Sequence, residues 1–351
     1  CWEKGRKMAS PTRSAYMRER DERGWHWRPL IFLAILVVLL WAASWVFLPK
    51  NNTYEDGMED ILTNGYLGEP ENSLDVLILG DSVPKFSVIP TELWNKWGMT
   101  SYICAGAGSH FPKTLENAER FFETQSPKVV LLDANQLYKE IKPGEALELW
   151  LERRFPLLRY HDNWKKVSPR RMLRPVHMTT VYWEKGYHLC KLIEPTEALT
   201  HMQPDDGVEM PPEKNVRYLK RLMKLCQAHG ARLVITSPPT TKVMTMARHK
   251  GLKLLTEQYG LLYWNLNLCL EEMKFDWSKN TADCGEHLNY WGAVKVTRAL
   301  GRRLATLGVP DHRGDNAYAA WDDCYTNFLK LAEQAAGSTG EVLPLDWEKI
   351  E

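Results

Sequence analysis

The segment from Leu30 to Leu48, LIFLAILVVLLWAASWVFL, contains 19 residues and no charge. An α-helix of that length can cross the hydrocarbon core of a bilayer, which is about 30 Å thick. Trp41 and Trp45 lie toward its C-terminal end, and indole rings favour the headgroup zone of a membrane. We therefore expect one transmembrane helix over residues 29–49.

Charges are distributed unequally around this segment. Residues 1–28 contain eight lysines and arginines, whereas the charged residues that follow Lys50, from Glu55 to Asp60, are acidic. Because basic residues are retained on the cytoplasmic side, we expect 1–28 to be a cytoplasmic basic tail and the rest of the chain to be extracytoplasmic. A cleaved signal peptide is the main alternative, but its apolar region would span only about 7–15 residues. A buried helix of a soluble domain is the third interpretation.

Composition and cysteine spacing narrow the classes of ligand. A formal net charge of +1 and the absence of any familiar nucleic-acid module argue against a nucleic-acid partner. Disulfides are possible in an extracytoplasmic domain, and six cysteines follow the expected span: Cys104, Cys190, Cys226, Cys269, Cys284 and Cys324. None of them forms a CxxC pair or a zinc-like Cys/His spacing, so we expect no metal and no cofactor.

Beyond an acidic linker over residues 50–72, apolar runs of strand length alternate with helical patterns. Five runs are continuously apolar, as in strands buried on both faces of a sheet: 75–80, 101–105, 128–134, 232–237 and 261–266. Helical periodicity covers 112–125, 213–229, 241–258 and 290–307. This order predicts an α/β three-layer sandwich with a parallel five-stranded sheet over residues 73–307.

Two segments lie outside this alternation. Residues 139–212 form an insertion rich in Trp, Tyr, Arg, His and Pro, with helical spacing in its first part and a loop-like tail. An insertion of this size is either a site of substrate or partner contact or a surface cap without a specific ligand. Residues 308–351 form a polar C-terminal tail in which we expect one helix, around Asp323 to Gln334.

The first expected strand runs directly into Gly80-Asp81-Ser82. Parallel sheets carry their sites at the carboxyl ends of strands, so Ser82 is a candidate nucleophile. A serine hydroxyl needs a base within hydrogen-bond reach and donors for an oxyanion. The alternative is that Asp81 and Ser82 only cap a helix, as these residue types often do.

The candidate base is His287, which follows a polar, glycine-containing loop and precedes the last helical pattern. Asp283 stands four residues before it, close enough across a turn to orient the imidazole so that it can accept a proton. The alternative makes His287 a helix-start residue and Asp283 a loop cap.

Four ordered blocks resemble those of the SGNH/GDSL hydrolase superfamily: GDS at 80–82, CAGAGS at 104–109, DAN at 133–135 and DCGEHLNYWGA at 283–293. The similarity covers roughly residues 72–305. It is strongest toward the membrane-anchored SGNH-like proteins of bacterial surface-polymer acylation, which include alginate O-acetylation and D-alanyl-transfer proteins. The resemblance implies an SGNH/flavodoxin-like sheet and a location in the bacterial cell membrane.

Carried over position by position, the resemblance makes Ser82 the nucleophile, His287 the general base and Asp283 its orienting acid. The oxyanion hole would combine Ser82, Gly106 and Asn135, with Gly108 as the alternative to Gly106. Three departures stand out. The family acid usually lies three residues before the histidine, where this chain has Cys284. The second block usually begins with an Asn, near Cys104 of this chain, and the third usually reads Gly-x-Asn-Asp where this chain has DANQ.

The candidate triad predicts a serine esterase or acyltransferase that works through an acyl-enzyme. The resemblance implies that it is extracytoplasmic and acts by O-acyl chemistry on a cell-surface polysaccharide or glycopolymer. A single helix cannot carry an acyl donor across a membrane, so the resemblance also implies a multi-pass membrane O-acyltransferase as partner. A catalytically weak or inactive scaffold, or a glycan-binding subunit of such a complex, is the alternative. A lipase would need an apolar cleft lip, of which the charged insertion gives no sign.

Overall fold

A computed structural model describes residues 27–198 and 200–335 of the chain. Nearly all of the expected cytoplasmic tail, residues 1–26, lies outside the described residues. Five parallel strands form one sheet in the order β2-β1-β3-β4-β5. The strands are β1 (Val76–Gly80), β2 (Ser101–Ala105), β3 (Val129–Asp133), β4 (Arg232–Ser237) and β5 (Leu262–Asn265). The predicted α/β fold with a parallel five-stranded sheet is therefore confirmed.

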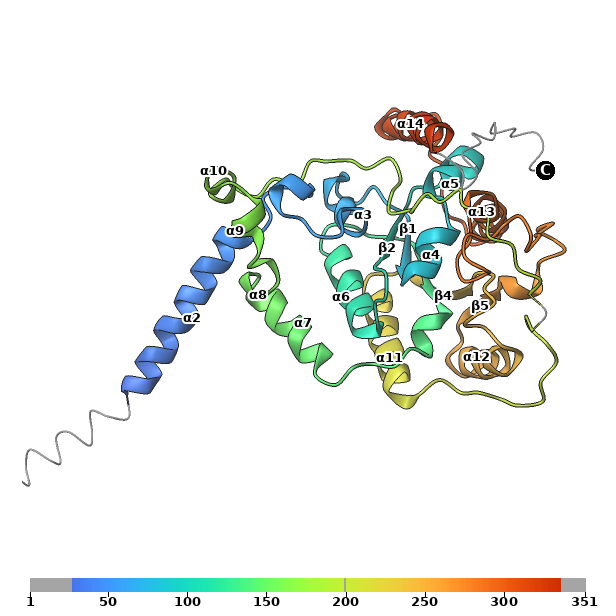
Figure 1. The fold of residues 1–351 in the computed structure, drawn as a ribbon, viewed down its shortest axis with the longest axis horizontal. Coiled ribbons are helices and arrows are strands. Elements are labelled where there is room, and N and C mark those ends of the chain that lie inside the picture. Colours follow the sequence, from blue (N-terminus) through green and yellow to red (C-terminus); the bar gives the residue numbers. More distant parts are fainter. Residues whose placement is uncertain (1–26, 199, 336–351) are drawn as a thin grey trace, which may run out of the picture.

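Helices cover both faces of the sheet (Figure 1). On one face, Leu77 and Leu79 of β1 pack in a core with three helices: α6 (Phe111–Phe121), α11 (Glu213–Ala228) and α12 (Met246–Tyr259). On the other face, Val76 and Ile78 pack with α5 (Pro90–Trp97), α13 (Tyr290–Ala305) and α14 (Ala320–Gln334). Since successive strand residues point to opposite faces, each strand feeds both cores, which explains its continuous apolar run.

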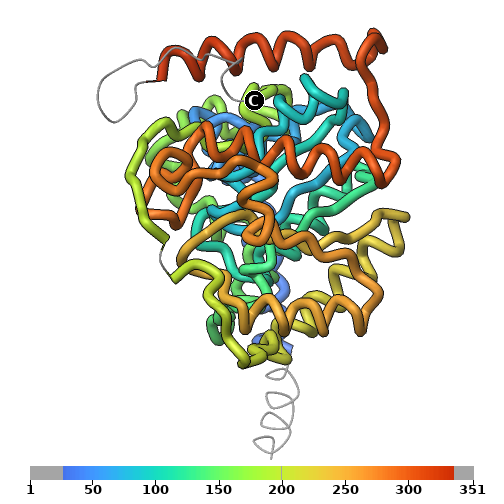
Figure 2. The backbone as a smooth tube through the Cα atoms, turned by 90° about the vertical axis from the view of Figure 1, so that its right-hand side faces the viewer, coloured from blue at the N-terminus to red at the C-terminus, as the bar shows by residue number. Residues whose placement is uncertain are grey.

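The helix in the expected C-terminal tail belongs to this second layer. α14 starts at Ala320, and its Phe328 and Ala332 side chains pack in the same core as Val76 and Ile78. Figure 2 shows α14 lying across the outside of the domain. Residues 50–72 also pack on the domain: α3 (Ile61–Asn64) contacts β2, and the Thr63 hydroxyl donates to the Ala105 carbonyl at 2.8 Å.

One long apolar helix, α2 (Arg28–Phe47), precedes the domain. Its mean hydropathy is 2.7 and only 6% of its most apolar window is buried, so it is long and apolar enough to cross a membrane. Figure 1 shows it projecting away from the sheet. Its C-terminal end contacts the insertion.

The first part of the insertion is helical: α7 (Glu145–Arg154), α8 (Leu157–Tyr160), α9 (Asn163–Lys166) and α10 (Pro169–Met172). Its second part is extended and crosses the β2 edge, where the Ile103 amide donates to the Lys185 carbonyl at 3.0 Å. The Lys185 ammonium is itself buried in an ion pair with Glu69 at 2.6 Å. Covering an edge strand in this way blocks its pairing with other chains.

The six cysteines of residues 104–324 are all free thiols in the described structure. Cys104, Cys226 and Cys324 are buried, where burial raises the pKa of each thiol. Neutral, buried thiols of this kind pack as small apolar side chains.

Candidate active site

Ser82 is the first residue of a short helix, α4 (Ser82–Ser87), that follows β1 directly. Asp81 caps this helix, because its Oδ1 accepts a hydrogen bond from the Val83 amide at 3.0 Å. The change of direction requires glycine at position 80, where a Cβ atom would lie 2.6 Å from Pro84 Cγ and 2.7 Å from Asp133 Cβ. The sheet therefore presents the Ser82 hydroxyl at its carboxyl edge.

His287 lies on a hairpin-like loop in which Thr281 pairs with Leu288. The Ala282 amide donates to the His287 carbonyl at 3.0 Å, and the Glu286 amide donates to the Asp283 carbonyl at 3.2 Å. The two residues between Asp283 and Glu286 have positive φ angles, 53° at Cys284 and 90° at Gly285. Two successive positive φ angles are typical of a type I′ hairpin turn. This tight turn brings a carboxylate four residues before the histidine into reach of its ring.

Hydrogen bonds hold the turn in this unfavourable conformation. The Gly285 amide donates to Thr281 Oγ1 at 2.6 Å, and the Gly285 carbonyl accepts from the Thr241 amide at 2.9 Å. A non-glycine residue in the left-handed region costs about 1–3 kcal/mol, which applies to Cys284. The surrounding hydrogen bonds must offset that cost, so residues outside the turn hold it in this conformation.

The structure brings Ser82, His287 and Asp283 into one hydrogen-bonded series. His287 Nε2 lies 2.7 Å from Ser82 Oγ, and His287 Nδ1 lies 2.5 Å from Asp283 Oδ2. Asp283 Oδ1 also accepts from the His287 backbone amide at 2.5 Å. The His287 side chain is 16% exposed, but that of Asp283 is 41% exposed. The carboxylate therefore orients the ring from a partly solvated position, which weakens its electrostatic effect.

A cluster of three rings that the sequence did not reveal includes the candidate base. The centre of the Phe86 ring lies 4.7 Å from that of His287 and 4.6 Å from that of His188, and both pairs are tilted. His188 comes from the insertion, and its amide donates to the Lys85 carbonyl at 2.8 Å. Burial lowers the pKa of His188, with smaller contributions from Lys85 and His287. The insertion thus adds a neutral ring to the edge of the site.

A buried polar network lies under the Ser82 turn, and the sequence did not reveal it either. Asp81 Oδ2 accepts from Asn135 Nδ2 at 2.8 Å and from Lys139 Nζ at 2.7 Å. Asp133, at the end of β3, accepts from the Asn135 amide at 3.2 Å, and its Oδ2 atom has no hydrogen-bond partner in the described structure. Burial, followed by the nearby charge of Asp81, raises the pKa of Asp133 well above its usual range.

The predicted oxyanion-hole residues lie in different surroundings. Ser82, Asn135 and Gly108 line a cavity of about 480 Å³. Gly106 is buried, is not part of that lining, and its carbonyl accepts from the Ser109 amide at 3.0 Å. One hydrogen of the Asn135 amide is used by Asp81, which leaves the other for a ligand. The oxyanion hole stays a prediction, in which Gly108 fits the cavity better than Gly106.

The remaining cavity wall is mostly charged. Lys139 pairs with Asp81, and the Arg248 guanidinium pairs with Glu209 at 2.9 Å. Lys242 and Glu286 complete the charged lining. Among residues 27–198 and 200–335, no group of three or more His, Cys, Asp or Glu side chains is arranged to hold a metal ion. Of the three predicted catalytic residues, Ser82 lines this cavity, whereas His287 and Asp283 are not part of its lining.

Comparisons with known proteins leave the family open. No protein-family model and no curated protein matches the chain. Among solved structures, a Bacteroides fragilis protein provisionally described as an acylhydrolase matches with a TM-score of 0.36 and 9% identity, over 70% of this chain and 94% of that one. A gut microbial diltiazem-metabolizing enzyme matches with a TM-score of 0.24 and 10% identity, over 67% and 47% of the two chains. Scores this low carry no argument about function.

Proposed function

We propose that this chain is an extracytoplasmic serine O-acyl esterase or acyltransferase that acts on a cell-surface polysaccharide or glycopolymer. The observation that carries the proposal is the 2.7 Å contact between Ser82 Oγ and a histidine that is held by a carboxylate on its other nitrogen. Nucleophile, base and orienting acid in that geometry are the requirements of acyl transfer on any fold. The site stands at the carboxyl end of β1, where parallel sheets bind ligands.

The chemistry follows from these contacts. Ser82 Oγ attacks the carbonyl carbon of an ester or thioester, and its proton passes to His287 Nε2. Asp283 stabilises the imidazolium that forms. His287 then protonates the leaving group, which yields an ester of Ser82 with the acyl group. Water or a sugar hydroxyl next attacks that ester, with His287 again taking the proton, so hydrolysis and transfer differ only in the acceptor.

The setting of the domain is part of the same proposal. α2 would be a retained anchor in a bacterial cell membrane, with its N-terminus in the cytoplasm and the catalytic domain outside. A multi-pass membrane O-acyltransferase would then deliver the acyl group, because one helix offers no path across the bilayer. The basic flank of the apolar segment and the absence of charge within it support this orientation.

A non-catalytic scaffold or glycan-binding subunit is the second candidate. Two observations favour it: the carboxylate of Asp283 is 41% exposed, and the Asn135 amide is partly used by Asp81. Both would weaken stabilisation of a developing charge. A charged cavity of about 480 Å³ could still bind a polar polymer without chemistry.

Labelling of the full chain in detergent micelles with a fluorophosphonate serine probe separates the two candidates. We expect the wild type to be labelled, Ser82→Ala to be unlabelled, and His287→Ala to be labelled about 10²–10⁴-fold more slowly. Ser168→Ala, which changes an exposed serine of the insertion that makes no capping hydrogen bond, is the control and should label like the wild type. Labelling that survives Ser82→Ala would overturn the assignment, and an unlabelled wild type would favour the scaffold.

A further inference from the structure

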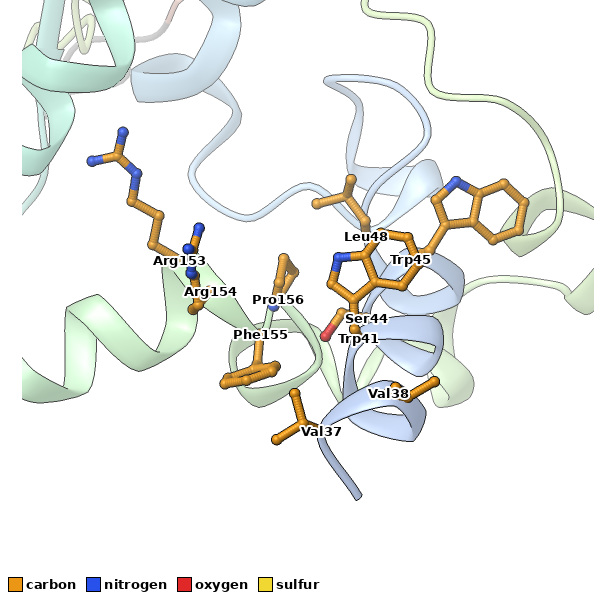
Figure 3. Close-up of a pocket in the computed structure, with 10 residues that line it drawn as sticks. All are labelled: Val37, Val38, Trp41, Ser44, Trp45, Leu48, Arg153, Arg154, Phe155 and Pro156. Carbon is orange, nitrogen blue, oxygen red and sulfur yellow. The ribbon is translucent and has the colours of Figure 1, made fainter. Parts of the chain in front are cut away.

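A second cavity, of about 630 Å³, lies where the apolar helix α2 meets the insertion (Figure 3). Residues of α2 between Val37 and Leu48 form one wall, and the corner between α7 and α8, from Arg153 to Pro156, forms the other. The cavity shares no lining residue with the one at Ser82. Its size falls within the range of about 300–1,000 Å³ that is usual for ligand sites.

The wall on α2 is apolar and exposed. Trp41 is 69% exposed and Val38 is 62% exposed, and both side chains are drawn in Figure 3 together with Phe155 of the opposite wall. If α2 is the retained anchor of the proposed function, on which this inference rests, its wall of the cavity runs from the middle of the bilayer to the outer end of the span. Val38 lies about 15 Å below Leu48, in a hydrocarbon core about 30 Å thick. The wall therefore faces the acyl chains of the outer leaflet, and its upper end faces their headgroups.

The rim of the cavity is basic. Arg153 forms two ion pairs: Nη1 with Glu119 at 2.6 Å and Nη2 with Glu123 at 2.7 Å. Arg154 is exposed, and no ion pair is recorded for it within the described part of the chain. No acidic residue lines the cavity. Arginines in the last turn of a helix also complement its dipole, but that effect does not require an apolar cavity beside them. Arg154 therefore offers a free guanidinium beside an apolar wall.

The two walls are fixed to each other. The Leu157 amide donates to Ser44 Oγ at 3.3 Å, and Asn163 Nδ2 donates to the Phe47 carbonyl at 3.1 Å. Ser44 is only 3% exposed on a helix that is otherwise largely uncovered. Because these hydrogen bonds fix α2 to the insertion, the two walls of the cavity keep their relative positions.

We infer that this cavity binds one phospholipid of the outer leaflet. Its phosphate would lie on the Arg154 guanidinium, which matches phosphate geometry with two parallel donors. One acyl chain would lie against Val37, Trp41 and Phe155. A lipid held there bridges the anchor and the insertion, so it fixes the orientation of the domain, and of the Ser82 cavity, relative to the bilayer.

The test is lipid titration of the delipidated full chain in detergent micelles, followed by native mass spectrometry. Three probes separate the parts of the ligand: dioleoylphosphatidylglycerol, dioleoylglycerol with the same chains but no phosphate, and inorganic phosphate with no chains. We expect one equivalent of phosphatidylglycerol to bind at least about tenfold more tightly than either fragment, a difference of about 1.4 kcal/mol.

Variants locate the site. Arg154→Ala should lower the affinity for phosphatidylglycerol about tenfold, to that of dioleoylglycerol. Arg170→Ala, an exposed arginine of α10 that lies outside the cavity, should bind like the wild type. Equal binding of phosphatidylglycerol and dioleoylglycerol, unaffected by Arg154→Ala, would overturn the proposal and favour a purely apolar occupant such as a partner helix. Binding of phosphate alone with the full affinity would overturn it as well.

Two readouts keep this inference apart from the proposed function. Ser82→Ala should bind phosphatidylglycerol like the wild type, so loss of serine chemistry leaves the lipid result standing. The intact mass of the membrane-extracted chain reports whether α2 is retained. A chain that retains α2 and labels at Ser82 but shows no preference for phosphatidylglycerol would sink the lipid site alone.

Discussion

The two segments that meet at the Ser82 hydroxyl are built in different ways. The Ser82 side consists of a strand end and a helix start, with an Asp81 side chain that is 2% exposed and bonded to two neighbouring residues. The His287 side is a two-residue turn with left-handed backbone, whose Cys284 is exposed. The sheet thus fixes the nucleophile, whereas a local loop fixes the base.

This difference predicts different consequences of mutation. Changes on the Ser82 side disturb the buried core and should lower the stability of the whole domain. Changes in the turn that carries His287 move a partly solvated loop, so they should lower activity and leave the fold intact. The four predictions below test that separation, from the largest expected effect to the smallest.

Asp283→Asn should give the largest loss of activity. An amide can still accept from the His287 backbone amide, but its NH₂ group would face Nδ1 and force the wrong tautomer on the ring. We expect hydrolysis of 4-nitrophenyl acetate to fall by about 10²–10⁴-fold, with an unchanged thermal midpoint. Glu271→Gln, an exposed carboxylate of the preceding segment, is the control. An equal loss in both variants would contradict the role of Asp283.

Asp81→Ala should instead lower the free energy of unfolding, by about 1–3 kcal/mol. It removes the cap on the Val83 amide and the acceptor of the Asn135 side-chain amide. It also removes the carboxylate partner of Lys139, whose ammonium keeps only the Ser109 carbonyl. Urea denaturation measures the effect. Asp315→Ala removes a cap of the same kind from an exposed turn and should cost less. Equal costs would show that the Asp81 network adds nothing beyond capping.

Gly285→Ala and Cys284→Gly should act in opposite directions on the turn. A Cβ atom at Gly285 would lie 2.6 Å from Thr241 Oγ1, and the backbone there has a φ of 90°. Alanine should therefore displace His287 and lower activity by about tenfold, which corresponds to an increase of about 1.4 kcal/mol in the activation free energy. Glycine at position 284 accepts the left-handed φ and should keep wild-type activity. Steady-state kinetics measure both effects. An equal loss of kcat/KM in the two variants would contradict the role assigned to the turn.

Asp133 should give the most gradual effect, a change in how stability depends on pH. Because its pKa is raised in the folded state, its contribution to stability is full below its unfolded pKa of about 3.9. That contribution is lost as the pH rises toward the folded pKa, by at most about 1.4 kcal/mol per unit. Asp133→Asn mimics the protonated form, so its stability relative to wild type should increase between pH 5 and 8. A constant difference across that range would contradict the shift.

The regular parts of the fold could be predicted because burial alone determines them. The apolar run at 76–80 and three of its counterparts form strands that are buried almost throughout, whereas β5 at the sheet edge is partly exposed. The polar residue after the first strand, Ser82, lies at the carboxyl edge of the sheet. His287 and Asp283 were also proposed from the sequence, because residue type and order along the chain suggest a base and its orienting acid. The contact between His287 and Ser82 is what the structure adds.

The missed features depend on contacts between distant segments. The contact of Phe86 with His188 joins α4 to the insertion, and the Asp81 network joins the start of α4 to the residues that follow β3. No local pattern predicts either. The reach of Asp283 depended on positive φ at Cys284, a conformation that a cysteine rarely adopts. Gly106 and Gly108 are equivalent in sequence, and only the cavity lining distinguishes them.

Trapping of the acyl-enzyme tests the central proposal most directly. The full chain is mixed with 4-nitrophenyl acetate, quenched in acid at early times and mapped by peptide mass spectrometry. The account predicts an acetyl group on Ser82, absent from Ser82→Ala and slower to form in Asp283→Asn. Acetylation of another residue, or none at Ser82 at any time, would contradict a catalytic role for this serine.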